Sequence, residues 1–246
     1  MNDLSRLSAA ILAGGPGTRL RSVVADRPKC LAPVRGRPFV AWILDQLAHA
    51  GVRDAVLCTG YMADMMQATL RSSHGPVQLR YSRETSPLGT GGALRQALSM
   101  LNSDPVLVLN GDSYCDVDLV AFFNFHDAHA ASATLALTQV SDVSRYGHVV
   151  VDAQHRVREF VEKSASHDPF APPLAGWINA GVYLLSRPFI ASVPQNIAVS
   201  LERETFPSAI SAGLHAFRGT GRFIDIGTPD SYAAADAFFA LVSPRP

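Results

Sequence analysis

Cysteine is scarce in this chain, and the few cysteines present are far apart. The 246 residues include only Cys30, Cys58 and Cys115, an odd number without the close spacing of metal ligands. The sequence therefore excludes a full set of internal disulfides, and it fits a reducing compartment. Cys115 lies close to an acidic motif, and we interpret it as a small buried hydrophobic residue rather than as a nucleophile.

Long apolar runs and an excess of charge of one sign are missing as well. No apolar run reaches about 18 residues, the length of a membrane span, and the first residues do not resemble a secretion leader. Lysine plus arginine and aspartate plus glutamate balance at 21 each, so no general positive field exists to hold nucleic acid or an anionic membrane. We expect a cytoplasmic protein that binds neither, in which any anion site is local. The oligomeric state is left open, a homo-oligomer included.

Hydrophobic residues are abundant, and their pattern indicates an α/β fold. With 48% hydrophobic content, 246 residues suffice for one domain spanning residues 1–246. Up to about residue 132, short strands alternate with segments of helical spacing, which predicts a Rossmann-like, mostly parallel central sheet. The strands expected here are 55–59, 77–81 and 105–110; the helices begin near Phe39, Met62 and Gly89 and end near Gly51, Leu70 and Leu101.

From about residue 133 the pattern changes to strands separated by turns. This change predicts a smaller mixed or antiparallel portion that extends to residue 246. Residues 164–175, which contain prolines and a histidine, are typical of a flexible loop, and we expect them to order over a substrate. The strands expected here are 134–137, 148–151, 157–161, 178–185 and 222–226, and the helices are 200–211 and a last one from about Asp230.

A glycine-rich turn near the N-terminus is the first candidate site. The apolar run 10–13 ends in Gly14-Gly15-Pro16-Gly17-Thr18-Arg19-Leu20. Glycines allow the backbone to pass close to a ligand and to point N–H groups at its phosphates. Arg19 adds a guanidinium fork and Lys29 a compact positive charge, which together suit a polyphosphate. The turn predicts phosphate binding, although it matches neither the ATPase phosphate loop nor the dinucleotide fingerprint, and a plain glycine turn stays open at this point.

A second glycine-rich loop, residues 84–94, opens the helix that ends near Leu101. We expect the N-terminus of that helix to bind an anion or a base.

Two aspartates each follow an apolar strand. Asp112 comes after Gly111 at the end of strand 105–110, and Asp225 follows Phe223 and Ile224. Ligands of open α/β sheets bind at the carboxyl ends of the strands. Mg²⁺ prefers one or two carboxylates together with phosphates and water, so this pair is a candidate Mg²⁺ site. The alternative is two surface aspartates in turns.

The run 12–20 together with Pro28-Lys29 resembles the signature of the sugar-1-phosphate nucleotidyltransferases. Asp112 within 109–112 and Asp225 before 226–229 match the metal-binding positions of that family, and the resemblance covers nearly the whole chain. The branch that the chain resembles most is the D-glycero-D-manno-heptose 1-phosphate guanylyltransferases, on runs such as 144–147, 178–181 and 200–202. The resemblance implies a GT-A-like nucleotidyltransferase fold, with a nucleotide-binding half at about 1–132 and a sugar-binding half at about 133–246.

The same resemblance implies an enzyme that transfers a nucleoside monophosphate from GTP to a sugar 1-phosphate, with Mg²⁺ as cofactor. The implied sugar is D-glycero-D-manno-heptose, which gives GDP-heptose and pyrophosphate. The residues implied are Arg19, Lys29, Asp112 and Asp225 for catalysis, the two aspartates also as metal ligands; Leu12, Gly14, Gly15, Gly17, Thr18, Glu84, Gly89 and Thr90 for the nucleotide; and Gly147, Glu162, Lys163 and Asn179 for the sugar phosphate.

The base is predicted from Glu84, which precedes a run, 87–90, that resembles the base loop of guanylyltransferases. A carboxylate can accept from both N1–H and N2–H₂ of guanine, whereas uracil offers one donor and adenine has no N1–H. If Glu84 faces the base edge, guanine is favoured. The alternative is a surface glutamate, with the backbone reading the base.

Other functions stay open on the sequence. Mannose-1-phosphate guanylyltransferases, and uridylyl- or thymidylyltransferases of the same family, are alternatives within the fold. A non-catalytic nucleotide-sugar sensor and a glycosyltransferase are alternatives of another class, the latter because Asp116-Val117-Asp118 spells the DxD motif. We instead expect Asp118 to cap the helix that runs to His129. We interpret His126 and His129 on that helix as surface or packing residues.

Overall fold

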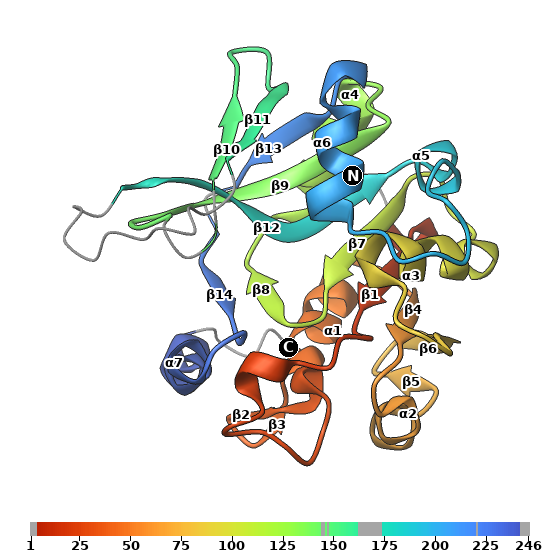
Figure 1. The fold of residues 1–246 in the computed structure, drawn as a ribbon, viewed down its shortest axis with the longest axis vertical. Coiled ribbons are helices and arrows are strands. Elements are labelled where there is room, and N and C mark those ends of the chain that lie inside the picture. Colours follow the sequence, from red (N-terminus) through yellow and green to blue (C-terminus); the bar gives the residue numbers. More distant parts are fainter. Residues whose placement is uncertain (1–3, 144–145, 147, 162–173, 220, 242–246) are drawn as a thin grey trace.

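An eight-stranded sheet forms the centre of the molecule in the computed structural model, which describes residues 4–143, 146, 148–161, 174–219 and 221–241. The strand order is β13-β9-β12-β7-β1-β4-β6-β5 (Figure 1). Strands β7, β1, β4 and β6 are parallel, whereas β12 runs antiparallel to both β7 and β9. The bounds are β1 Ser8–Leu12, β4 Asp54–Thr59, β5 Ser73–His74, β6 Val77–Arg83, β7 Val106–Asn110, β9 Ala133–Val140, β12 Gly176–Leu185 and β13 His215–Arg218. The predicted α/β fold with a mostly parallel centre is confirmed.

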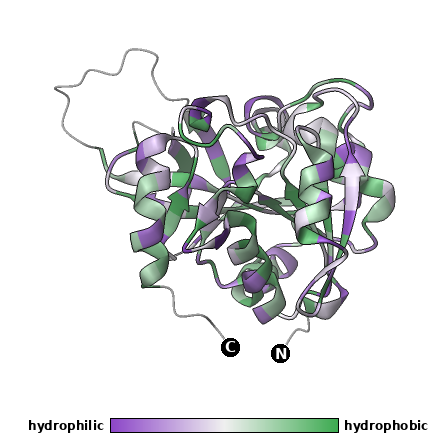
Figure 2. Ribbon diagram, turned by 90° about the horizontal axis from the view of Figure 1, so that it is seen from below, coloured by the Kyte–Doolittle hydropathy of each residue, from purple (hydrophilic) through white to green (hydrophobic). Residues whose placement is uncertain are grey.

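Helices cover both faces of this sheet, which explains why the central strands are apolar along their whole length. Ala9 and Ile11 of β1 belong to the core on one face, with α1, α2, α4 and α7, whereas Ala10 belongs to the core on the other face, with α3, α5 and α6. Figure 2 shows apolar strands between helices that have a hydrophobic and a hydrophilic side. The bounds are α1 Phe39–His49, α2 Ala63–Leu70, α3 Gly89–Ala97, α4 Leu119–Ala128, α5 Arg187–Ala191, α6 Phe206–Ala209 and α7 Pro229–Ala240.

Three two-stranded sheets complete the fold. The predicted strands 148–151 and 157–161 form the antiparallel hairpin of β10 (His148–Val151) and β11 (Val157–Val161). A short hairpin joins β2 (Pro33–Val34) to β3 (Arg37–Pro38). The third sheet pairs β8 (Ser113–Cys115) with β14 (Phe223–Asp225), and it brings a segment from the middle of the chain beside one near its end. The sequence pattern did not predict β8.

A continuous helix was expected over 200–211. The segment is helical, but it is not one regular α-helix. A π turn at Leu201–Thr205 is followed by α6, and a 3₁₀ turn at Ile210–Ala212 ends the segment. Pro207 lies in the first turn of α6. Because proline has no N–H, it cannot complete the α-helical ladder that the expected helix requires at this point.

Helices α1, α2, α3, α4 and α7 agree with the predictions, α5 was not predicted, and Cys115 is buried as expected. All three cysteines are buried and unpaired, as expected of small hydrophobic residues. In the part of the chain that the structure describes, no helix combines the length and the apolar character needed to cross a lipid bilayer.

Candidate active site

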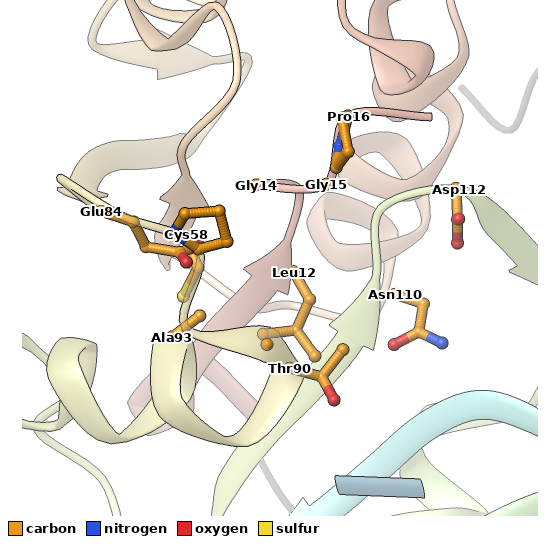
Figure 3. Close-up of a pocket in the computed structure, with 12 residues that line it drawn as sticks. Leu12, Gly14, Gly15, Pro16, Cys58, Glu84, Thr90, Ala93, Asn110 and Asp112 are labelled. Atoms are coloured by element: carbon orange, nitrogen blue, oxygen red, sulfur yellow. The ribbon is translucent and has the colours of Figure 1, made fainter. Parts of the chain in front are cut away.

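A cavity of about 270 Å³ lies at the carboxyl ends of the parallel strands. Leu12 ends β1, and its register partners Cys58 and Asn110 lie near the ends of β4 and β7. All three line the cavity, as expected for a ligand site of an open α/β sheet. Figure 3 shows Glu84 and Asp112 on opposite sides of it, with Gly14 and Gly15 of the glycine turn between them. The full lining is Leu12, Gly14, Gly15, Pro16, Cys58, Glu84, Pro87, Gly89, Thr90, Ala93, Asn110 and Asp112.

The three glycines of the first turn meet different requirements. Gly17 has φ +59°, in the left-handed region, and a Cβ there would come within 3.0 Å of the Lys29 Cβ. Gly14 packs directly under the Glu84 carboxylate, so a side chain would collide with it. Only at Gly15 would a Cβ meet nothing within 4 Å. The backbone at Gly15 is therefore the part of the turn that lies open to a ligand in the cavity.

Glu84 is half-buried on the wall of this cavity. Its Oε2 accepts a hydrogen bond of 2.7 Å from the Leu88 N–H, which fixes the turn before α3. Burial raises the pKa of the Glu84 carboxyl, and the Leu88 bond offsets this only in part. The side chain is therefore both a structural brace and a carboxylate at the cavity, and its Oε1 lies against Gly14.

Two of the N–H groups at the N-terminus of α3 are used inside the protein. The N–H groups of Gly91 and Gly92 both donate to the Val199 carbonyl, at 2.8 and 3.3 Å. A Cβ on Gly89 would lie 2.5 Å from the same oxygen. Gly91 and Gly92 therefore serve the close packing of α3 on residues 197–199, whereas Gly89 and Thr90 line the first cavity, and an anion- or base-binding role for this helix end stays a prediction.

A second cavity, of about 280 Å³, adjoins the first, and both are lined by Asn110 and Asp112. The pairing of β8 with β14 forms its floor: Asp225 is the register partner of Ser113, and the Ile226 N–H donates to the Asp112 carbonyl at 2.9 Å. The two predicted aspartates thus lie on neighbouring segments and face one cavity. Its lining is Arg19, Asn110, Asp112, Ser113, Tyr146, Asn179, Gly181, Phe223, Asp225, Gly227 and Thr228.

Both predicted cations reach this region. Lys29 forms an ion pair with Asp112, and the Lys29 side chain is only 15% exposed. Arg19 lines the second cavity, where its Nη2 would lie 3.4 Å from a Cβ added to Gly227. Among the described side chains, Arg19 makes no ion pair, so its guanidinium is available to an anion.

Asp225 is held by three donors. Its Oδ2 accepts from the Tyr146 hydroxyl at 2.7 Å, and its Oδ1 accepts from the Gly227 N–H at 2.7 Å and from the Ser231 hydroxyl at 3.4 Å. Donors on both oxygens fix the side chain at the cavity.

Asn179 is directed into the second cavity by an irregularity of β12. The register with β9 shifts between Asn179 and Tyr183, and Gly181 inside this bulge has φ +73°. Bulges re-aim side chains next to functional sites. The Asn179 Oδ1 accepts from the Gly181 N–H at 3.0 Å, so the bulge also orients the amide.

The donor set at the two aspartates fits Mg²⁺. Asp112 and Asp225 offer two carboxylates beside a cavity with room for phosphate and water, which is the environment that Mg²⁺ prefers. Among the described residues, no group of three or more histidine, cysteine, aspartate or glutamate side chains gathers as a metal site. Two carboxylates are compatible with a metal ion whose remaining ligands come from a substrate.

The structure gathers most of the predicted residues, but not all. Leu12, Gly14, Gly15, Glu84, Gly89 and Thr90 line the first cavity, Arg19, Asp112, Asn179 and Asp225 line the second, and Gly17 and Lys29 line a small cleft beside Asp112. Thr18 lines none of these three. Gly147, Glu162 and Lys163 lie outside the described residues, as does nearly all of the expected loop 164–175.

Asn110 and Tyr146 line the site, although no role was predicted for either. Asn110, shared by the two cavities, ends β7 and so obeys the strand-end rule that pointed to Asp112. Tyr146 is 37% exposed and bonds Asp225. The run 144–147 resembles the family locally, but the bond of Tyr146 to Asp225 had no local signal, since it joins residues 79 positions apart.

Asp118, the second aspartate of the DxD motif, caps a helix. Asp118 Oδ1 accepts from the N–H groups of Val120 and Ala121, at 3.0 and 2.9 Å, and so caps α4 as predicted. On the same helix, His126 is buried and its Nδ1 lies 2.8 Å from the Thr134 hydroxyl, which confirms a packing role.

A family model described as nucleotidyl transferase matches residues 8–240, which include both cavities. The chain belongs to the nucleotidyl transferase family. Among nucleotidyl transferases, it is 34% identical over 236 residues to a mannose-1-phosphate guanylyltransferase of Mycobacterium tuberculosis, covering 94% of this chain and 64% of that protein. The chain thus spans just under two thirds of the length of that relative.

A second relative and a solved structure match over nearly their full length. The chain is 34% identical over 230 residues to a D-glycero-alpha-D-manno-heptose 1-phosphate guanylyltransferase of Aneurinibacillus thermoaerophilus, covering 93% of this chain and 96% of that protein. The crystal structure of HddC from Yersinia pseudotuberculosis has a TM-score of 0.83 at 33% identity and covers 95% of this chain and 99% of that chain. HddC complexed with GMP-PN has a TM-score of 0.81 at 32% identity.

Proposed function

We propose that this nucleotidyl transferase is a sugar-1-phosphate guanylyltransferase, which joins GMP from GTP to a sugar 1-phosphate and releases pyrophosphate. The observation that carries the proposal is the meeting of two cavities at Asp112, with Lys29 paired to that aspartate and Arg19 beside Asp225. Two anionic substrates that react end to end require two adjoining sites with cations at the junction.

The proposed reaction is an in-line displacement at the α-phosphorus of GTP. An oxygen of the sugar phosphate forms the new P–O bond, and the bond to the bridging oxygen breaks as pyrophosphate leaves with the electron pair. A phosphate monoester has a second pKa of about 6, so the nucleophile is already mostly dianionic at neutral pH. The site therefore needs no general base, and its work is alignment and charge stabilisation.

The proposed roles follow from where the residues lie. The open backbone at Gly15 receives the triphosphate, while Lys29 and Arg19 stabilise negative charge on the transferred and leaving groups. Asp112 and Asp225 would hold Mg²⁺, which supplies further positive charge to phosphate oxygens when it is bound. Asn179 is proposed to bind sugar hydroxyls. Glu162, Lys163 and the Gly147 backbone stay predictions for the sugar phosphate.

GTP is proposed as the nucleotide on two grounds. Glu84 is a carboxylate on the wall of the first cavity, where it can accept from the two donors of the guanine edge. The similar HddC structure is complexed with GMP-PN, and both relatives are guanylyltransferases by name.

D-glycero-D-manno-heptose 1-phosphate is the proposed sugar substrate, and mannose 1-phosphate is the second candidate. The heptose relative matches over 96% of its length and the mannose relative over 64%, at equal identity. The runs 178–181 and 200–202, which resemble the heptose branch, favour heptose. The three buried, unpaired cysteines fit a reducing compartment, so the proposed location is the cytoplasm.

The proposal is tested by measuring pyrophosphate release from GTP, UTP, dTTP and ATP with heptose and mannose 1-phosphates as acceptors. We expect release from GTP with the heptose acceptor at the highest kcat/KM. Preference for UTP or dTTP would overturn the base assignment. Release with neither acceptor, together with binding of a finished nucleotide sugar, would favour a sensor, and transfer of sugar from a nucleotide-sugar donor would favour a glycosyltransferase.

A further inference from the structure

A chain of hydrogen bonds runs behind the two cavities and connects their walls. The Thr90 hydroxyl donates to the Glu202 Oε2 at 2.7 Å, and the Tyr183 hydroxyl donates to the Glu202 Oε1 at 3.2 Å. Asn179 Nδ2 in turn donates to the Tyr183 hydroxyl at 2.9 Å. Thr90 lines the first cavity and Asn179 the second. We call these four residues, Thr90, Glu202, Tyr183 and Asn179, the Glu202 relay.

Each proton of the relay has a direction fixed by Glu202. An ionised carboxylate only accepts hydrogen bonds, so every hydroxyl that faces it must donate. The Thr90 hydroxyl donates to Glu202 and accepts from the Leu201 N–H at 2.8 Å. The Ser200 hydroxyl likewise donates to Glu202, at 3.0 Å, and accepts from a backbone N–H at 3.2 Å. No donor or acceptor in this arrangement is in conflict.

The Asn179 amide is oriented in the same way, through the Tyr183 hydroxyl. Because the single proton of Tyr183 is committed to Glu202, the Tyr183 oxygen can only accept from Asn179, which must therefore present its NH₂ group to it. The Asn179 Oδ1 then faces the Gly181 N–H, which donates to it. One N–H and one lone pair of Asn179 are left for a ligand, in a fixed orientation.

Burial makes this orientation costly to change. Tyr183 is 0% exposed, and burial, followed by the neighbouring Glu202 charge, raises the pKa of its hydroxyl well above the usual value, so that it stays a donor. A buried donor that loses its acceptor loses more than the net value of one hydrogen bond. Glu202 itself lies in the π turn Leu201–Thr205, and such turns are frequent at functional sites.

We propose that Glu202 and Tyr183 are positioning residues for the acceptor sugar, which act by fixing the orientation of the Asn179 amide. This inference rests on the proposed function, in which Asn179 binds sugar hydroxyls. Neither Glu202 nor Tyr183 lines either of the two cavities, so each acts through its bonded neighbours. Of these neighbours, Thr90 lines the first cavity and Asn110 both, and Asn179 is the one that lines the second cavity alone. Sugar discrimination is therefore set in part by a carboxylate outside the sugar site.

The first experiment separates the two substrates. Tyr183→Phe keeps the buried ring and removes the hydroxyl, and Glu202→Gln keeps the shape and removes the obligate acceptor. We expect Tyr183→Phe to raise the KM for the sugar 1-phosphate about three- to tenfold, the effect of losing one hydrogen bond, while the KM for GTP changes less than about twofold. Glu202→Gln should raise the sugar KM at least as much.

Glu204→Gln is the matched control, because Glu204 lies in the same π turn and, within the part of the chain that the structure describes, its carboxylate accepts only from the Ser200 backbone N–H, at 2.8 Å. We expect wild-type kinetics from it. If Tyr183→Phe and Glu202→Gln behave like this control, the inference is wrong, while the proposed function stands as long as the wild type forms the GDP-sugar. If the wild type forms none from heptose or mannose 1-phosphate, the proposed function fails instead.

The second experiment asks whether Tyr183 acts through Asn179. In an Asn179→Ala background, Tyr183→Phe should cause no further rise in the sugar KM, because the amide that it orients is gone. Rises that multiply in the double variant would mean that Tyr183 supports the fold generally and would overturn the inference. A panel of monodeoxy sugar 1-phosphates adds a readout: discrimination against one of them should shrink in Glu202→Gln and persist in Glu204→Gln.

Discussion

Single residues at the junction of the two cavities carry two kinds of task. Glu84 stabilises the turn before α3 by a hydrogen bond and also presents a carboxylate to the first cavity. Asp112 pairs with Lys29 and also faces the cavity that Asp225 shares. To test the charge of these residues alone, substitutions should be isosteric, so that the charge is removed while the shape of the side chain is kept.

Asp112→Asn and Asp225→Asn each remove one carboxylate charge from this junction. We expect kcat to fall at least about 100-fold in either variant, the scale observed when a group that stabilises transition-state charge is removed, with the fold retained. Steady-state kinetics in Mg²⁺ and circular dichroism measure both. Asp230→Asn, an exposed position in the first turn of α7, is the control. Near-normal turnover of the two variants would remove these carboxylates from the mechanism.

Glu84→Gln tests base recognition, since glutamine cannot accept from two guanine donors at once. We expect the ratio of kcat/KM for GTP to that for UTP to fall. Because burial raises the pKa of Glu84, its carboxyl takes up a proton at higher pH than usual. The wild-type ratio should therefore decline as pH falls from 7 toward 5, and that of Glu84→Gln should not. Equal pH profiles would return guanine recognition to the backbone.

At the scale of elements, close contacts rather than propensity hold the site in place. α3 begins against residues 197–199 because glycines allow backbone contact there. α4 is capped by Asp118 and is tied to β9 by the bond between His126 and Thr134. The α4 residues line neither cavity, so the loss of these α4 links is expected to affect stability more than turnover.

His126 makes stability depend on pH. Burial lowers its pKa to about 4, below its usual value of 6.5. The unfolded chain therefore takes up this proton first, and the free energy of unfolding falls as pH drops from about 6.5 to about 4. Urea unfolding across this range should show a shallower slope in His126→Asn than in the wild type. His49→Asn, an exposed position on α1, should keep the wild-type slope; equal slopes in all three proteins would exclude His126 as the cause.

At the scale of the whole molecule, the last helix anchors the segment that carries Asp225. α7 follows Asp225 and packs on α1, where Phe239 stacks on Trp42 with ring centroids 4.3 Å apart, and on β8, where it meets Tyr114 edge-on at 5.0 Å. β8 in turn follows Asp112. The last helix of the described chain is thereby packed against the strand that follows Asp112.

Phe239→Ala removes this contact, and we expect it to lower the free energy of unfolding by about 3–5 kcal/mol, the usual cost of emptying a buried aromatic site. Phe239 is 1% exposed. Leu241→Ala is the matched control, because Leu241 is 78% exposed just beyond the same helix. Urea denaturation should show a large loss in the first variant and almost none in the second. Equal losses would mean that α7 is not anchored through Phe239.

The sequence by itself determined the α/β class, most strands and helices, and a set of candidate site residues. Glycines after a strand, Asp112 after another and the cap at Asp118 are local signals, because backbone freedom, strand ends and capping depend on neighbours in the chain. The helix over 200–211 was mispredicted where Pro207 interrupts a helical pattern.

Only the tertiary structure decided which of these residues meet. Three-residue strands such as β8 and β14 have too few positions for a periodic signal, yet their pairing sets Asp225 beside Asp112. Gly91 and Gly92 of α3 belong to a glycine-rich pattern that predicts a ligand site, but their N–H groups donate to the Val199 carbonyl. The Glu202 relay joins residues up to 112 positions apart. Such contacts depend on strand register and packing between distant segments, which no local pattern of residues encodes.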